Sequence, residues 1–260
     1  MSKFLDRLDR LSRGPTTAMG FGAGGRTEKL PGMLLVGDLS SGKRSAQAAA
    51  TLSKIGADGA LVPVEGPDGV PKNLAEALRD VPWGVRASAL TGDAVTGLRE
   101  KGCDFLAFAP EGAQVGALSD EDAGYILCVS QDMDEQALRA IEDLPVDAVL
   151  LALDSLGPPL TIQHLLAIGA VRGSFSKYFL LEVPAELTSG ELEGLKEMGV
   201  DGLVVDATTA SAKEMRGLKD RLMSLSRRQR NRGRKAGAIQ PRDSYAAPAS
   251  PHAEEDDEDF

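Results

Sequence analysis

Four times along this chain, a helix-like stretch ends in an aspartate that leads directly into an apolar strand. The four aspartates are Asp58, Asp104, Asp147 and Asp201, and they precede GALVPV, FLAFAP, AVLLAL and GLVV. The steps between them are 46, 43 and 54 residues, too long for one strand and one helix but long enough for two of each. Four such β-α-β-α units predict eight strands and eight helices, the number that closes a (β/α)8 TIM barrel.

We expect the barrel to occupy residues 33–226, after an N-terminal helix and irregular segment over 1–32 and before a basic helix end and a disordered charged tail over 227–260. The expected strands are 33–37, 59–64, 83–87, 105–109, 125–130, 148–153, 178–183 and 202–206. The expected helices are 43–55, 72–80, 91–101, 113–123, 133–143, 160–171, 188–198 and 210–230. An open doubly wound sheet has the same alternation, but it does not predict equal repeats that stop at eight strands.

Composition agrees with parallel strands buried on both faces. Hydrophobic residues make up 42% of the chain and aromatic residues only 4%, so the core must be mainly aliphatic. No apolar run reaches 18 residues, so no membrane span is expected, and the N-terminus has no apolar signal region. The two cysteines, Cys103 and Cys128, give no disulfide framework. We therefore expect a cytoplasmic protein.

A closed barrel places its functional residues at the carboxyl ends of the strands. Counting seven residues from each repeated aspartate reaches Glu65, Glu111, Asp154 and Thr208. The other strand ends add a further set of mostly acidic residues: Asp38, Arg86, Asp132, Glu182 and Asp206. Converging carboxylates bind a hard divalent cation or raise one another's pKa, so the barrel mouth is the expected site.

These residues predict a metal-assisted lyase or isomerase that acts on a small anionic metabolite. Glu111, Asp132 and Asp154 would bind Mg²⁺, and Glu65 and Glu111 would serve as acid and base. Arg86 would hold a carboxylate or phosphate of the substrate and take part in catalysis. A structural interpretation also stands, because an aspartate after a strand often caps the next helix. An arginine inside an apolar strand needs a carboxylate partner under either interpretation.

The segment Gly37–Arg44 follows a strand and opens a helix, and its sequence GDLSSGKR resembles a phosphate-binding loop. Arg44 stands where that motif needs a hydroxyl for Mg²⁺, so a nucleotide hydrolase is not favoured. The backbone near Ser41 and Lys43 remains a candidate substrate-binding site for a phosphate or carboxylate at a helix N-terminus. His164 falls within a helix, and no lysine lies inside a strand, which disfavours a Schiff-base aldolase.

The ends of the chain carry their own charge pattern. Residues 227–235 read RRQRNRGRK and residues 254–259 read EEDDED, on a chain of net charge −10. The acidic body argues against nucleic-acid binding, except weakly through Arg227–Lys235. The alternative function is a non-catalytic barrel that acts as a scaffold or interaction protein through this tail. The amphipathic helix over 3–12 is expected either to close the barrel bottom or to join copies into a homo-oligomer.

The patterns GADGALV and GVDGLVVD resemble the aldolase-type barrel superfamily, which includes ribulose-phosphate-binding barrels and the tryptophan synthase alpha subunit. The resemblance covers about 33–226 and implies the barrel and a site at its mouth, but no individual catalytic residue. Arg86, Glu111 and Asp132 are also loosely similar to the Mg²⁺-dependent citrate-lyase-type barrels, whose surrounding motifs this sequence lacks.

Overall fold

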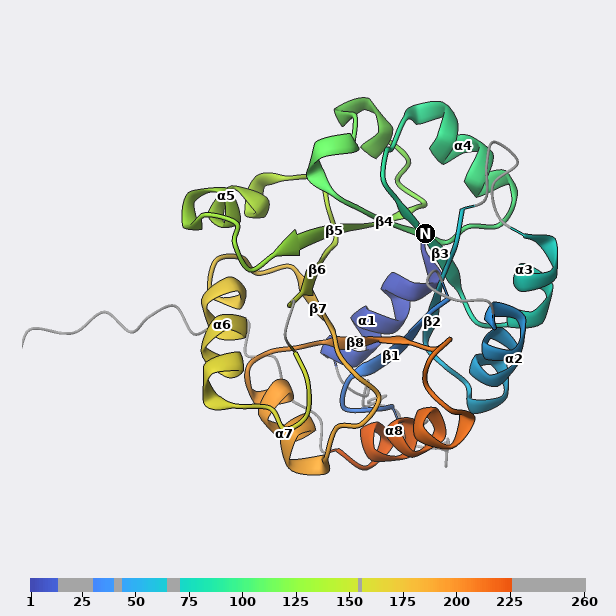
Figure 1. Ribbon diagram of the computed structural model, residues 1–260. Helices are drawn as coiled ribbons and strands as arrows, with labels where there is room; N and C mark the ends of the chain where they lie inside the picture. Colours follow the sequence, from blue (N-terminus) through green and yellow to red (C-terminus); the bar gives the residue numbers. More distant parts are fainter. Residues whose placement is uncertain (14–29, 40–43, 65–70, 154–155, 226–260) are drawn as a thin grey trace, which may run out of the picture. The chain divides into compact units, whose positions relative to one another are not determined.

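The computed structural model describes residues 1–13, 30–39, 44–64, 71–153 and 156–225. Eight parallel strands form a closed barrel in sequence order, and the last strand pairs with the first (Figure 1). The strands are β1 (Leu34–Asp38), β2 (Gly59–Val62), β3 (Trp83–Ala87), β4 (Phe105–Phe108), β5 (Gly124–Ser130), β6 (Ala148–Ala152), β7 (Tyr178–Glu182) and β8 (Gly202–Asp206). The predicted (β/α)8 TIM barrel is confirmed.

The helices that follow the strands surround the barrel, and α1 precedes the first strand. They are α1 (Lys3–Arg13), α2 (Ser45–Ile55), α3 (Lys72–Leu78), α4 (Gly92–Glu100), α5 (Glu135–Ala140), α6 (Ile162–Arg172), α7 (Ser189–Glu197) and α8 (Ala212–Ser224). The helix predicted over 113–123 is wrong, because two short 3₁₀ helices, η1 (Pro110–Gly112) and η2 (Val115–Leu118), follow β4. Proline and two glycines within seven residues disfavour an α-helix there. A third 3₁₀ helix, η3 (Ile141–Asp143), continues α5.

Three glycines in the repeats adopt the left-handed backbone conformation that ends a helix. Gly56, Gly102 and Gly199 have φ angles of 64°, 90° and 89°, and each stands two residues before a repeated aspartate. The amide of Gly56 donates back to the last carbonyls of α2, as expected of a C-terminal cap. These glycines therefore mark the ends of the helices, and each leads the chain directly into a barrel strand.

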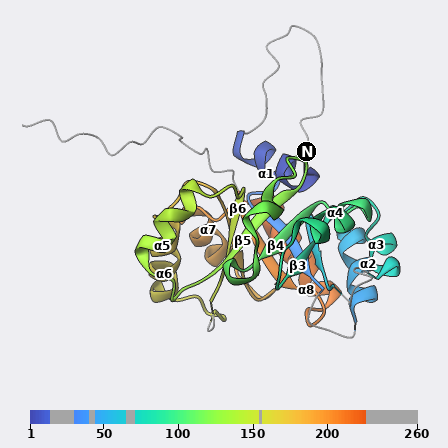
Figure 2. The ribbon, with the colours of Figure 1, turned by 90° about the horizontal axis from the view of Figure 1, so that it is seen from above.

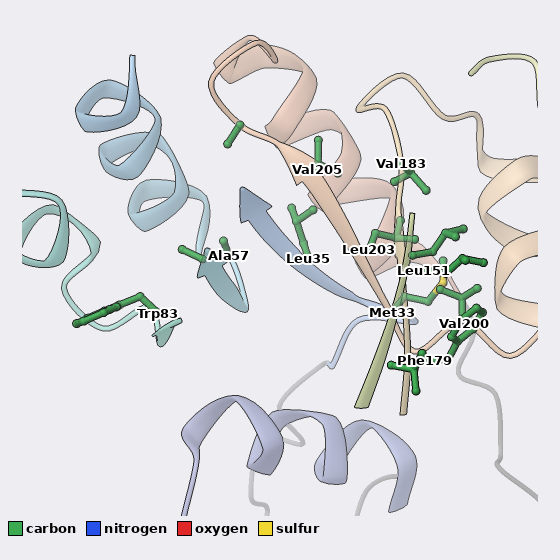
Figure 3. Close-up of a cluster of buried hydrophobic side chains, with 14 of the residues drawn as sticks. Met33, Leu35, Ala57, Trp83, Leu151, Phe179, Val183, Val200, Leu203 and Val205 are labelled. Carbon is green, nitrogen blue, oxygen red and sulfur yellow. The ribbon is translucent and has the colours of Figure 1, made fainter. Parts of the chain in front are cut away.

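The outer face of the barrel packs against the surrounding helices through aliphatic side chains. Leu35, Leu151, Leu203 and Val205 are buried on this face, and Phe179 joins them from β7 (Figure 3). The inner face forms a separate cluster, which contains Leu34, Val36, Leu61, Phe105, Ala107, Ile126, Ala148, Leu150, Leu180 and Val204. The strands thus bury both faces, as the aliphatic composition predicts.

Helix α1 closes the amino-terminal end of the barrel, here called the barrel bottom (Figure 2). Its Phe4, Leu8 and Leu11 are buried in the inner cluster, and the ring of Phe4 stacks on Phe105 with the ring centroids 4.6 Å apart. The strands leave room for this ring, since a Cβ atom on Gly59 would lie 3.1 Å from it. Of the two arrangements that the sequence left open, the structure has the closed barrel bottom.

The repeated Asp104 anchors the start of α1. Its carboxylate accepts hydrogen bonds of 2.8 Å from the Ser2 hydroxyl and from the backbone amides of Lys3 and Phe4. The helix is also fixed further along, because Arg7 donates to the carbonyls of Ala57 and Asp58. A carboxylate at a helix N-terminus satisfies amides that have no partner inside the helix. Asp104 therefore acts as a cap supplied from about a hundred residues away.

The other three repeated aspartates tie neighbouring strands together. Asp58, Asp147 and Asp201 each accept the backbone amide of the preceding strand, at 2.8–2.9 Å from the nitrogens of Leu35, Tyr125 and Phe179. Asp58 also receives the buried Lys219 ammonium at 2.7 Å.

In the described part of the chain, no helix is long and apolar enough to cross a membrane.

Candidate active site at the barrel mouth

Alternate residues of the odd-numbered strands bring four side chains into one layer at the carboxyl end of the barrel, here called the barrel mouth. The strand register places Asp38, Arg86, Cys128 and Glu182 at the same height, two residues above the apolar positions of the inner face. Such layers of four, contributed by alternate strands, are the usual filling of this fold. Here the uppermost layer within the strands is charged.

Arg86 on β3 connects two carboxylates, Asp38 on β1 and Glu182 on β7, and only β8 separates these two strands in the closed barrel. Its Nη2 atom donates to Asp38 Oδ2 at 3.1 Å and to Glu182 Oε1 at a short distance. Because both oxygens contact the same nitrogen, the two carboxylates lie close together. The side chains of Asp38, Arg86 and Glu182 are 15%, 33% and 31% exposed, so the cluster remains open to a ligand.

The electrostatics of this cluster favour a permanently charged arginine. Burial lowers the pKa of Arg86, but the negative charge of Glu182 and its hydrogen bond raise it by more, so the net shift is upward. Among the described residues, the hydrogen bonds of Arg86 all run through Nη2, and its buried Nε has no partner. A guanidinium has five N–H donors, so Arg86 keeps donors for a further acceptor.

Cys128 completes the layer as an uncharged side chain. Burial raises the pKa of its thiol to about 11, and the nearby Arg86 opposes this shift only in part. The thiol is therefore protonated at neutral pH and behaves as a small apolar group. Nucleophilic chemistry at Cys128 is not favoured by this environment.

Asp206 stands at the end of β8, beside Asp38 in the strand register. Its Oδ1 accepts from the Thr208 amide at 2.9 Å and from the Thr208 hydroxyl at 2.6 Å. Asp206 thereby orders the turn that leads to α8. This role differs from the helix cap that the sequence kept open for aspartates after a strand, because Ser211 caps α8.

Two hollows meet at this layer. A polar hollow of about 220 Å³ is bounded by Asp38, Glu182 and Asp206, with Leu153, Leu156 and Val183 around it. A larger hollow of about 490 Å³ begins at Arg86 and Cys128 and extends between the ends of β3 and β4 and α4. A still larger groove of about 900 Å³ lies on the outer flank, between the loop before α7 and α8, and none of the four layer residues lines it. The chemical groups therefore favour the mouth over this outer groove.

The residues predicted for the site have different places in the structure. Arg86 lies at the centre of the mouth and has the carboxylate partners that the sequence required of it. Glu111 is exposed in η1, and Asp132 is exposed in the turn after β5. Ser41, Lys43, Glu65 and Asp154 lie outside the described residues, so their predicted roles stay predictions. The exposed His164 caps its own helix, where its Nδ1 accepts the Thr161 amide.

The sequence missed Cys128, and it did not pair Asp38 and Glu182 through one arginine. A signal for Cys128 was available, since counting in twos along β5 from the inward Ile126 reaches it. The described residues contain no group of three or more His, Cys, Asp or Glu side chains arranged to hold a metal ion. Between Asp38 and Glu182, the positive charge comes from Arg86.

The sequence matches no protein-family model and shows no similarity to any curated protein. The structure, however, resembles several solved barrels. A tryptophan synthase alpha-subunit variant from Pyrococcus furiosus has a TM-score of 0.53 at 11% identity, over 74% of this chain and 96% of that one. A chain of tryptophan synthase from M. tuberculosis has a TM-score of 0.56 at 16% identity, over 86% and 98%.

A third similar structure is a chain of the BexX/CysO complex from Amycolatopsis orientalis, with a TM-score of 0.52 at 19% identity over 78% and 93%. The fold that this chain shares with them is the (β/α)8 barrel. Identities this low show the fold alone, so the chemistry has to be argued from the barrel mouth of this chain.

Proposed function

We propose that this chain binds a small anionic metabolite at the barrel mouth and acts on it as a lyase or isomerase. The observation that carries the proposal is the partly exposed cluster of Asp38, Arg86 and Glu182, in which two carboxylates share one arginine at the usual functional end of the fold. The similar tryptophan synthase structures are consistent with a catalytic barrel of this type.

In this proposal, Arg86 holds the anionic group through the N–H donors that its carboxylate partners leave available. The bound anion would then lie beside Asp38 and Glu182, the two carboxylates that can exchange protons with it. One carboxylate then takes a proton from a carbon or hydroxyl of the metabolite, and the protonated one delivers a proton to the product or leaving group. Two carboxylates in unequal states are a recurring solution for acid–base catalysis at neutral pH.

A divalent cation remains part of the proposal through the predicted ligands Glu111, Asp132 and Asp154. Glu111 and Asp132 are both exposed. An ion bound by all three carboxylates would require Asp154 to lie close to both of them. A titration with Mg²⁺ or Mn²⁺, followed by the melting temperature of the wild type and of Glu111→Gln, decides this part. Equal melting curves with and without metal would remove the cation from the mechanism.

Binding is tested by titrating inorganic phosphate and malonate at constant ionic strength, with chloride as the replaced anion. The wild type should be stabilised, and Arg86→Gln should lose the effect. Arg139→Gln is the matched control, because Arg139 forms an exposed ion pair with Glu135 on α5. Stabilisation that survives in Arg86→Gln would contradict the assigned anion site.

Proton transfer is tested without knowing the substrate. Small carboxylates with acidic C–H bonds, such as malonate and oxaloacetate, are incubated with the protein in deuterated water, and deuterium incorporation is followed by NMR. The wild type should accelerate exchange for at least one compound, and Glu182→Gln should abolish the acceleration. If anions bind at Arg86 but no compound exchanges, the non-catalytic barrel becomes the favoured function.

A further inference from the structure

The larger hollow at the barrel mouth, here called the apolar compartment, has walls that the proposed acid–base cluster does not explain. It measures about 490 Å³, within the usual range for small-ligand pockets. Apart from Arg86 and Ser88, its lining is mainly apolar, with Val64, Leu90, Leu98 and several alanines. A small charged metabolite would need only the cluster itself.

The compartment is built on fixed backbone contacts. The amide of Leu90 donates to the carbonyl of Gly112 at 2.9 Å, and the amide of Gln114 donates to the carbonyl of Leu90 at 2.9 Å. These bonds join the loop after β3 to the segment after β4. They require a close approach, because a Cβ atom on Gly112 would lie 2.0 Å from the Ser88 carbonyl oxygen. The hollow therefore has a defined wall.

Apolar surface is also exposed at the rim of this compartment. Val64 remains 42% exposed, although most large aliphatic side chains of the strands are buried. Small side chains at Ala87, Ala89, Ala94 and Ala109 widen the space beside it. Covering exposed apolar surface with a ligand is favourable, at about 25 cal/mol for each Å² removed from water.

We propose that the apolar compartment selects amphiphilic anions, in which a carboxylate or phosphate bound by Arg86 carries a branched aliphatic or aromatic body that lies between β3, β4 and α4. This inference rests on the proposed function, because it uses the same Arg86 as the anion site. The protonated Cys128 lies at the junction, and it offers the ligand an apolar surface there.

The test is a series of monocarboxylates of equal charge and increasing apolar size. Acetate, butyrate, 3-methylbutanoate and phenylacetate are titrated against the full chain by ligand-observed NMR at constant ionic strength. Affinity should rise by about threefold to fourfold for each buried methylene group, so phenylacetate should bind at least tenfold more tightly than acetate.

Two variants locate the effect. Ala94→Phe should fill the compartment and reduce phenylacetate to the affinity of acetate, without changing acetate. Thr96→Phe is the matched control, because Thr96 is exposed on the same helix and does not line the compartment. Ala109→Leu provides a second way to fill the space from the end of β4. Arg86→Gln should weaken every member of the series.

The outcomes separate this inference from the proposed function. Equal affinity for acetate and phenylacetate would overturn the apolar compartment and leave the anion site in place. Failure of every carboxylate to bind the wild type, while inorganic phosphate and malonate also fail, would overturn the proposed function itself. Phenylacetate that binds Ala94→Phe or Arg86→Gln as tightly as the wild type would show a hydrophobic contact elsewhere, and it would overturn the inference.

Discussion

The two ends of the barrel treat their charged side chains in different ways. At the bottom, the four repeated aspartates bind backbone amides, and one of them also binds the buried Lys219. At the mouth, Asp38, Arg86 and Glu182 bind one another and stay partly exposed. A carboxylate that accepts backbone amides is fixed by the fold, whereas a carboxylate bound by a side chain can exchange that partner for a ligand. The contacts at the bottom therefore stabilise the fold, whereas the mouth is where the proposed chemistry would take place.

The largest loss of stability is expected from Phe4→Ala at the barrel bottom. The ring of Phe4 is fully buried and stacked on Phe105, so its removal leaves a cavity inside the barrel. We expect a loss of about 3–5 kcal/mol in the free energy of unfolding, measured by denaturant titration. Val115→Ala is the control, because Val115 is 85% exposed and should change stability little. Equal stability of the two variants would mean that α1 does not close the barrel in solution.

A smaller loss is expected from Asp104→Asn, which replaces the carboxylate that caps α1. The part-buried amide of Lys3 and the buried amide of Phe4 would lose a charged acceptor, so the free energy of unfolding should fall by about 2–3 kcal/mol. Asp122→Asn is the control, because Asp122 is exposed and its carboxylate accepts from the N-terminal ammonium, whereas its backbone amide donates to Asp120. Hydrogen exchange of the α1 amides should accelerate in Asp104→Asn alone. Unchanged exchange would contradict the assigned cap.

An intermediate effect concerns Cys103, which lies beside Asp104 at the bottom. Burial raises the pKa of its thiol from 9.0 to about 12. The unfolded chain therefore releases this proton at a lower pH than the folded chain does. The stabilisation of the folded chain that comes from this difference in pKa is complete below about pH 9, and it is lost as the pH rises toward 12.

Denaturant titrations at pH 8 and pH 10 measure this difference. Between these values the wild type should lose about 1 kcal/mol more than Cys103→Ala, because one pH unit of differential titration corresponds to about 1.4 kcal/mol. Lysine titration affects both proteins and cancels in the comparison. Parallel losses in the two proteins would show that the Cys103 site is open to water.

The smallest effect on stability is expected at the mouth. Arg86→Gln breaks two ion pairs, but all three side chains are partly exposed, so water can solvate the carboxylates that remain. We expect a loss of about 1 kcal/mol in the free energy of unfolding, together with the loss of anion binding. A destabilisation as large as that of Phe4→Ala would place the cluster among the structural contacts and erase the contrast between the two ends.

The sequence predicted the barrel because most of the repeated aspartates bind the strand next to their own. Asp58, Asp147 and Asp201 each start a strand and bind its neighbour, so the spacing between them measures the repeat directly. The role of Asp104 could not be read in this way, since its partners in α1 lie about a hundred residues earlier. Contacts between distant segments leave no periodic pattern in a single sequence.

The mouth was predicted only in part, for a related reason. Arg86 was identified because an arginine inside an apolar strand needs a partner, and the structure supplies two. Counting from the repeated aspartates led instead to Glu111, which follows the end of β4 and is exposed in a 3₁₀ helix. Seven residues from Asp104 run past the end of β4, where the chain turns into η1 and the regular spacing of a strand no longer applies. The register between strands, which sets the layer of Asp38, Arg86, Cys128 and Glu182, is known only from the folded barrel.

The cap that Asp104 places on α1 also sets an order of events during synthesis. Helix α1 leaves the ribosome before the barrel strands, but its cap and the Phe105 ring that covers Phe4 come about a hundred residues later. At roughly 5–20 residues per second, this interval is about 5–20 s. During that time Phe4, Leu8 and Leu11 have no barrel to enter. Helix α1 is thus made before the barrel but is buried only once the barrel has formed. During synthesis, chaperones can bind its apolar face before its own core is available.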